Sequence, residues 1–217
     1  MKKLMMVALI PLLFSGCALT GKRKVSATQP LTMAQLLEFK NDSVNVTYLQ
    51  KSTTTANVIA VVPISGEISD GGEFGNANTV EDVKLMLRIA AEDYRVKAVI
   101  LKVDSPGGST NASDLIWNEV MKFKKSGKPV VAFFNGIAAS GGYYVSVPAD
   151  RIIATPETET GSIGVIMYAV DISSKLAKEG TTYEVFKSGD NKDMLSPHKP
   201  ATKEAKEIMQ IIIDSSY

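Results

Sequence analysis

From Val58 onward, apolar runs rich in β-branched residues alternate with segments of helical periodicity. The runs are "VIAVVPISGEI" from Val58, "VKAVILKV" from Val96, "KPVVAFF" from Lys128 and the shorter "RIIAT" from Arg151. Continuous apolar runs of this kind are typical of strands that are buried on both faces of a sheet. Their spacing suits right-handed crossover connections, so the pattern predicts an α/β fold with a mainly parallel sheet.

The segments between these runs have the periodicity of amphipathic helices. A helix capped by Thr79 would present an apolar face, made of Val80, Val83, Leu87, Ala90 and Ala91. The remaining elements are expected as helices over Ala112–Lys125, over 173–180 and from Thr202 to about Ile213, and as strands within 161–172 and over 181–187.

Composition limits the classes of function. The chain has 217 residues and 45% hydrophobic content, enough for one substantial core. With 24 basic and 23 acidic residues, the formal charge is +1, and such a balance predicts no nucleic-acid partner. A single cysteine, Cys17, excludes an intrachain disulfide. Because His198 is the one histidine, we expect no metal site and no other cofactor.

Residues 1–17 have the layout of an export signal. A short basic start precedes an apolar run over Leu4–Phe14, which is too short to span a bilayer as a helix, and Cys17 follows. The arrangement resembles a bacterial lipoprotein signal, in which the cysteine is lipidated and becomes the mature N-terminus. It departs from that pattern at Phe14, where leucine is usual. The alternative is a plain signal peptide with an incidental cysteine.

These features divide the chain into three parts. Residues 1–17 are the lipoprotein-type signal, residues 18–57 a tether and N-terminal extension, and residues 58–217 the folded domain. We expect this domain to be truncated at its C-terminus, because no glycine or proline follows the last helix before Tyr217. The predicted location is the bacterial cell envelope, where acyl chains on the exported protein would anchor it to a membrane.

Two glycine-bearing loops carry the best candidates for chemistry. "DSPGGS" follows the run from Val96, and "NGIAASGG", which contains Ser140, follows the run from Lys128. Strand ends gather at one edge of a parallel sheet, where sites form, and glycine loops there offer N–H groups that can stabilise an oxyanion. Ser140 would begin a helix, near the positive end of its dipole. A serine at such a turn is more often an N-cap or a packing choice. The Gly-x-Ser-x-Gly nucleophile elbow is absent, since Ala138 stands two residues before Ser140.

A nucleophilic serine also needs a base. His198 lies in a polar segment flanked by prolines, which favours an exposed loop. A free lysine has a pKa of about 10.4, and lowering such a pKa by about three units takes roughly 4 kcal/mol. Burial in an apolar pocket can supply this. The lysine candidates are Lys187 and Lys192 in "VFKSGDNKDMLSP", although most lysines of the chain are expected at the surface.

Three motifs in this order resemble one known family. They are "DSPGGS", "GIAASGGYYVSVPADRIIATPETETGSIGVI" and "KSGDNKDMLSP". Together they are similar to the signal peptide peptidase A family of serine-lysine proteases, and the resemblance covers roughly Val58 to Tyr217. It implies a Clp protease/crotonase-like spiral of ββα units, which agrees with the alternation of strands and helices, and it makes 58–217 a peptidase domain.

The resemblance also implies roles for individual residues. Ser140 matches the nucleophile of the family, and Lys192 matches the lysine general base, whereas Lys187 falls outside the matched position. Gly107 and the N–H of Gly141 match the oxyanion-hole donors. Ser162 matches a serine that orients the lysine. His198 has no role in this scheme.

The function implied is a membrane-associated serine endopeptidase that cleaves signal-peptide remnants or other short, apolar, extended peptides through an acyl-enzyme. The resemblance further implies a homo-oligomer, in which Ser140 and Lys192 of neighbouring chains can meet. Family members usually have an N-terminal membrane span, where this chain has a lipoprotein-type signal, and they continue past the point that matches Tyr217. The alternatives are a catalytically inactive, lipid-anchored scaffold or binding protein on the same fold, a crotonase-type acyl-CoA enzyme, and a self-processing protease.

Overall fold

The computed structural model describes residues 6–9, 45–47, 57–70 and 80–217. The chain divides into two compact units, Met1–Ile163 and Gly164–Tyr217, and each is described by itself. Cys17, the predicted cap Thr79 and most of the predicted tether and N-terminal extension over 18–57 lie outside the described residues. No helix among the described residues is long and apolar enough to span a bilayer.

The first unit is built on one sheet. Its strands are β1 (Met6–Leu9), β2 (Asn45–Thr47), β3 (Val58–Ser65), β4 (Val96–Ser105), β5 (Val130–Ala139), β6 (Arg151–Ala154) and β7 (Glu159–Gly161). The order is β2-β1-β3-β4-β5-β6, with β7 also paired to β5. All described pairs are parallel except β1 with β3. The prediction of a mainly parallel α/β sheet is therefore confirmed, while β1 lies within the segment predicted as a signal.

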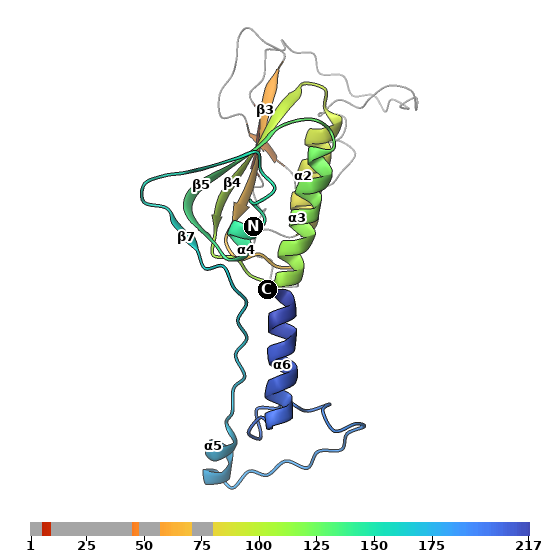
Figure 1. Cartoon of the computed structure of the whole chain (residues 1–217), viewed down its shortest axis with the longest axis vertical. Coiled ribbons are helices and arrows are strands. Elements are labelled where there is room, and N and C mark those ends of the chain that lie inside the picture. Colours follow the sequence, from red (N-terminus) through yellow and green to blue (C-terminus); the bar gives the residue numbers. More distant parts are fainter. Residues whose placement is uncertain (1–5, 10–44, 48–56, 71–79) are drawn as a thin grey trace. The chain divides into compact units, whose positions relative to one another are not determined.

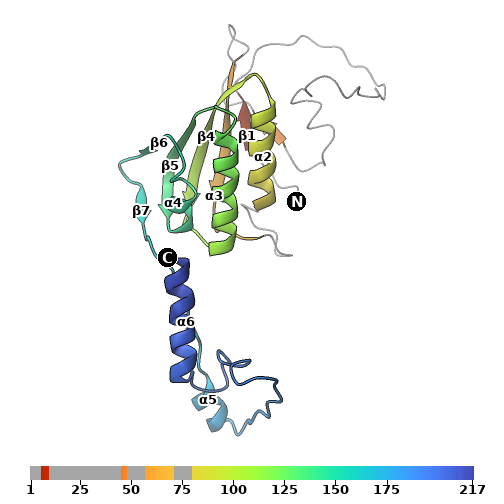
Figure 2. The same cartoon turned by 45° about the vertical axis from the view of Figure 1, so that its right-hand side comes forward.

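Two long helices pack side by side on one face of this sheet (Figures 1 and 2). They are α2 (Val80–Glu92) and α3 (Thr110–Lys124). Both were expected from their periodicity, and both connect parallel strands, as crossover helices do. Most of the largest fully buried side chains come from these helices and the central strands, and they include Phe134, Ile64, Met86, Leu87, Leu101 and Ile116. This core holds the carboxyl ends of β4 and β5 in fixed positions.

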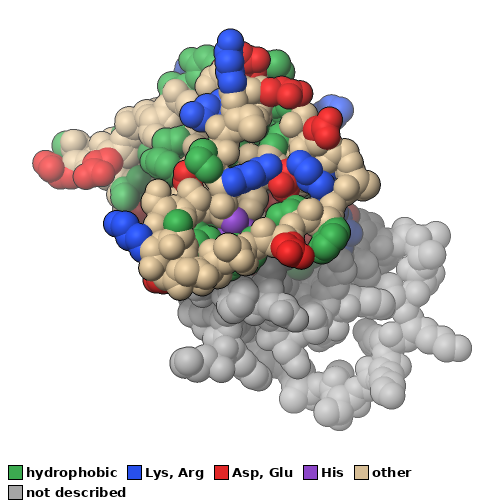
Figure 3. Space-filling view, turned by 90° about the horizontal axis from the view of Figure 1, so that it is seen from below, with side chains coloured by type: hydrophobic (Ala, Val, Ile, Leu, Met, Phe, Trp, Pro, Cys, Tyr) green, Lys and Arg blue, Asp and Glu red, His purple; other side chains and the backbone are tan. Residues whose placement is uncertain are grey.

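The second unit contains α5 (Ser173–Lys178) and α6 (Lys203–Ser216). The predicted cap of the last helix is confirmed, since Thr202 Oγ1 accepts a hydrogen bond from the N–H of Ala205 at 3.1 Å. The two strands predicted within 161–172 and over 181–187 are wrong: apart from Gly161, the end of β7, these residues are irregular. Among residues 164–217, Ala205 is the one buried hydrophobic residue. Figure 3 shows hydrophobic, basic and acidic side chains interspersed on the face seen from below.

Candidate active site

The two glycine loops meet at the carboxyl ends of β4 and β5. These strands are parallel neighbours, and Ser105 near the end of β4 is paired with Ala138 of β5. The chain continues from β4 into Gly107 and Gly108, and from β5 into Ser140 and the short helix α4 (Gly141–Tyr144). The sheet thus brings both motifs to one edge, as the sequence predicts.

Ser140 has an unusual backbone conformation. Its φ and ψ angles are 50° and −121°, a region that non-glycine residues rarely adopt and that costs on the order of 1–3 kcal/mol. It stands at the N-cap of α4, but its side chain makes no capping hydrogen bond. Its N–H instead donates to the carbonyl oxygen of Gly161 in β7 at 2.8 Å, and its own carbonyl accepts from Tyr144 N–H at 2.9 Å. A capping role therefore does not explain this serine, whose hydroxyl makes no hydrogen bond to another described residue.

Gly107 lies against the backbone of the Ser140 turn. It is buried, with a φ of +96°. A Cβ atom added to it would lie 2.6 Å from the nitrogen of Gly141 and 2.9 Å from the Cβ of Ser140. Only a glycine permits this approach. The N–H of Gly141, at the start of α4, is one of the helix-end donors that lack an intrahelical partner.

The amide of Gly107, one of the two predicted oxyanion donors, makes a hydrogen bond within its own loop. It donates to Ser105 Oγ at 3.1 Å, and this hydroxyl donates in turn to the carbonyl oxygen of Gly66 at 2.6 Å. Gly108, by contrast, is exposed, and its N–H makes no hydrogen bond to another described residue. The carbonyl oxygen of Gly107 accepts from Ile68 N–H at 2.8 Å, which attaches the loop between β4 and α3 to the residues that follow β3.

Ser162 directly follows β7 and is the other non-glycine residue with a positive φ among those described, at 50°. It is exposed, and the preceding Gly161 is the acceptor for Ser140 N–H. Thr160 Oγ1 also donates to the carbonyl oxygen of Ala138 at 2.8 Å. These bonds hold the backbone of the Ser162 segment next to the backbone of the Ser140 turn.

Lys192 belongs to the second unit. It is exposed and lies in a series of turns, where its N–H donates weakly to the carbonyl of Gly189 at 3.4 Å. Its ammonium group makes no ion pair or hydrogen bond within the part of the chain that the structure describes. His198 is only partly buried and stacks on Tyr183, with ring centroids 3.7 Å apart. Its Nδ1 lies 3.2 Å from Ser196 Oγ.

Within the described residues, no group of three or more histidine, cysteine, aspartate or glutamate side chains is arranged to hold a metal ion. The backbone of Gly107 and the amide nitrogen of Gly141 lie beside Ser140, an arrangement suited to covalent catalysis at a carbonyl carbon.

Two family models match the sequence. The model of Peptidase family S49 matches residues 122–217, and the Clp protease model matches residues 50–161. The matched regions contain all three motifs on which the resemblance was based. The chain belongs to the signal peptide peptidase A family. Its fold class is that of Clp protease, as expected from the sequence.

Named relatives agree with this membership. A signal peptide peptidase SppA of Enterococcus faecium is 36% identical over 219 residues, which cover 96% of this chain and 60% of the relative. Protease 4 of Salmonella typhi is 37% identical over 169 residues, covering 78% of this chain and 27% of the relative. The chain therefore spans less than two thirds of the length of either. Among solved structures, ClpP1 from Listeria monocytogenes is 24% identical, with a TM-score of 0.38 over 47% of this chain and 55% of that one.

Proposed function

We propose that this protein is a serine peptidase in which Ser140 is the nucleophile and Lys192 the general base. The observation that carries the proposal is the conformation of Ser140. The residue has a strained positive φ, its hydroxyl is not used as a cap, and Gly107 and Gly141 lie against it. Strain of this kind is concentrated at functional sites.

In the proposed reaction, Lys192 Nζ takes the proton of Ser140 Oγ, and Oγ attacks the carbonyl carbon of a peptide. The tetrahedral intermediate then collapses to an acyl-enzyme as the leaving amine takes the proton from Lys192. A water molecule that loses its proton to Lys192 releases the acyl group and restores Ser140. We assign to Ser162 the role of orienting the Lys192 side chain.

The oxyanion donors follow from the hydrogen bonds of the loop. Gly141 N–H, at the start of α4, makes no hydrogen bond to another described residue, which supports its predicted role. Gly107 N–H is held by Ser105 Oγ at 3.1 Å, so we assign the second donor to the neighbouring N–H of Gly108. Gly107 then contributes by its lack of a side chain, which lets the loop approach Ser140.

For substrates, we propose short, apolar, extended peptides such as cleaved signal peptides, because the name of the Enterococcus faecium relative includes signal peptide peptidase. We further propose attachment to a membrane of the cell envelope through a lipidated Cys17, and a homo-oligomer in which neighbouring chains share the site. The support for these is the sequence pattern of residues 1–17 and the family membership.

The test is hydrolysis of a fluorogenic apolar peptide between pH 6 and pH 10. We expect Ser140→Ala and Lys192→Ala each to lower kcat by about 10³-fold or more, because both residues act in the same proton transfer. Ser215→Ala and Lys203→Ala are the matched controls, since both residues are exposed on α6, and they should keep the parent rate. Activity that survives Ser140→Ala would refute the proposal, and a parent protein that cleaves no peptide would favour a scaffold role.

A further inference from the structure

The segment that carries Lys192 has no regular secondary structure. Residues 187–199 lie between α5 and α6 and form turns and irregular backbone. Catalytic groups must be held to within about 0.5 Å of their working position, and loops do this less well than helices or strands. If Lys192 is the base, side-chain contacts rather than the backbone hydrogen bonds of a helix or strand must therefore hold it in position.

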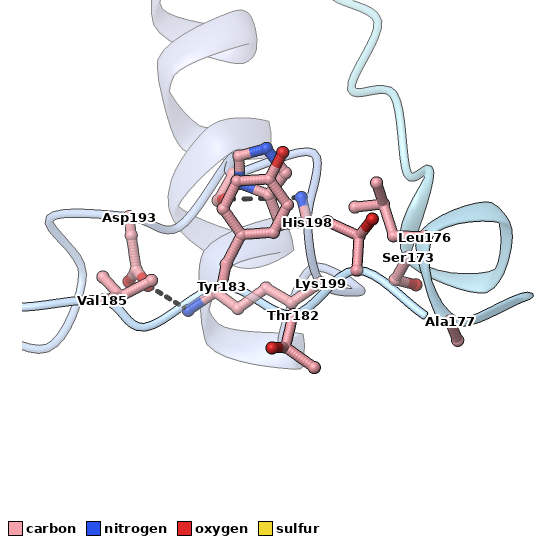
Figure 4. Close-up of a pocket in the computed structure, with 11 residues that line it drawn as sticks. Ser173, Leu176, Ala177, Thr182, Tyr183, Val185, Asp193, His198 and Lys199 are labelled. Carbon is pink, nitrogen blue, oxygen red and sulfur yellow. Dashed lines mark hydrogen bonds and ion pairs between the residues drawn. The ribbon is translucent and has the colours of Figure 1, made fainter. Parts of the chain in front are cut away.

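The residue after Lys192 joins both ends of this segment. One carboxylate oxygen of Asp193 accepts from Lys187 Nζ at 2.8 Å, and the other accepts from Lys199 Nζ at 2.8 Å. Only 16% of the Asp193 side chain is exposed. We call Lys187, Asp193 and Lys199 the Asp193 clip. Figure 4 shows its Asp193–Lys199 half beside the stacked rings of Tyr183 and His198.

Backbone contacts continue the clip into the turn. Lys187 Nζ also donates to the carbonyl oxygen of Asp190 at 2.7 Å, so one ammonium group bridges the residues on both sides of Lys192. Asn191 Nδ2 donates to Glu204 Oε1 of α6 at 3.0 Å. Together these bonds restrict the backbone of Lys192 while leaving its own side chain outside the network.

The clip also determines which lysines form ion pairs with the Asp193 carboxylate. Hydrogen bonds from Lys187 and Lys199 lower the pKa of Asp193 to about 2, so the group is ionised at neutral pH. Both of its oxygens are occupied by these two partners. An aspartate adjacent in sequence would otherwise be an obvious partner for Lys192, and an amine held in an ion pair is a poor proton acceptor.

We infer that Asp193 is a positioning residue for the reaction, which holds the loop that presents Lys192 and is itself kept from pairing with Lys192 by Lys187 and Lys199. This inference rests on the proposed role of Lys192 as the base. The two lysine side chains of the clip are 30% and 38% exposed. Ion pairs that water reaches add little to global stability, so the effect is local and should appear in the rate rather than in the unfolding midpoint.

The experiment compares Asp193→Asn with the parent, using the full chain. Asparagine keeps the size of the side chain but loses the charge that holds two ammonium groups. A displacement of about 1 Å costs on the order of 10²-fold in rate, so we expect kcat to fall by about 10- to 100-fold while KM stays within about twofold. Hydrogen exchange of the amides over 187–199 should become faster, and the urea midpoint should not change.

Two further variants separate positioning from other roles. Asp193→Glu restores the charge and should recover part of kcat. Glu207→Gln removes the exposed Lys203–Glu207 pair, 3.7 Å long, and as a control should change neither rate nor exchange. The ionisable side chains near Asp193 are those of Lys187, Lys199, Lys192, His198 and Tyr183. A positioning role lowers the maximum of the pH–rate profile without moving its midpoint, whereas a purely electrostatic role moves the midpoint.

The outcomes are distinct from those of the dyad test. If Lys192→Ala is inactive and Asp193→Asn keeps the parent kcat, or raises KM alone, the inference is overturned and the dyad stands. If Lys192→Ala keeps the parent rate, the proposed function fails, and with it the reason for positioning this loop.

Discussion

At the scale of single residues, the candidate site depends on positions where side-chain atoms are excluded. Gly107 approaches Ser140 and Gly141 so closely that a Cβ atom would have to displace backbone. The motif "DSPGGS" therefore reflects steric exclusion at the site as well as loop formation. The role of Ser105, which holds the Gly107 amide from a fully buried position, was missed from the sequence, although it is in the same motif.

Gly107→Ala tests this exclusion. The substitution introduces a Cβ 2.6 Å from the nitrogen of Gly141 at a φ of +96°. We expect the free energy of unfolding to fall by about 1–3 kcal/mol and kcat to fall by about 10²-fold or more. Gly127→Ala is the matched control, because Gly127 also has a positive φ, +76°, but has no atom within 4 Å of the added Cβ. It should cost about 1 kcal/mol of stability and leave kcat unchanged. Equal kcat losses in both variants would contradict the steric account.

At the scale of elements, the strands and helices of the first unit were predictable because pattern and burial agree. β3, β4 and β5 begin at or within two residues of their apolar runs, and the buried face of α2 includes four of the five residues expected from its periodicity. The strands expected within 161–172 and over 181–187 did not form. Whether a segment forms a strand depends on a neighbouring strand with which it can pair, and the sequence pattern does not show whether such a strand is present. The distant contacts that end a helix are equally invisible in the pattern.

Lys128 provides such a contact at the end of α2. Its ammonium group donates to the carbonyl oxygens of Ala90, Ala91 and Asp93, each at 2.8 Å. We expect Lys128→Met to lower the free energy of unfolding by about 1–3 kcal/mol, because carbonyl acceptors at the helix end lose a charged donor. Lys97→Met is the control, since Lys97 Nζ meets one exposed carbonyl, that of Tyr94, at 2.9 Å, and the change should cost less than about 0.5 kcal/mol. Urea unfolding followed by circular dichroism would measure both.

At the scale of the whole molecule, the sequence predicts which residues form the candidate site but not how these residues are arranged. The motifs named Ser140, Gly141 and Ser162, and the structure brings the backbone segments of all three together. The hydrogen bond of the Gly107 amide and the ion pairs on either side of Lys192 depend on side-chain contacts, which the hydrophobic periodicity of a sequence does not predict. The sequence therefore indicates which chemistry to test, and the contacts indicate which neighbouring residues to change.

Stability should fall in acid, and Asp93 provides the clearest case. Burial raises the pKa of this carboxyl, but hydrogen bonds and charge from Arg95, with the charge of Lys128, outweigh burial and hold its pKa below the usual value of 3.8. A carboxyl whose pKa is lower in the folded state contributes stability above its unfolded pKa and loses it as the pH falls through the folded value. The resolved pKa shifts of Asp150, Asp171 and Asp193 have the same direction.

We therefore expect the free energy of unfolding of the first unit to be steady from pH 7 to pH 5 and to decline below about pH 4. Urea unfolding at pH 7, 5, 4 and 3 measures it through the fluorescence of Trp117, the one tryptophan, which stacks on Tyr144 in this unit. Asp93→Asn should be less stable at pH 7 and should decline less in acid, because it has no carboxyl to protonate at this position. Glu81→Gln, whose exposed side chain pairs only with Lys84 among the described residues, is the control and should decline as the parent does. A parent protein that is as stable at pH 3 as at pH 5 would show that the buried Asp93–Arg95 pair does not link folding to proton binding.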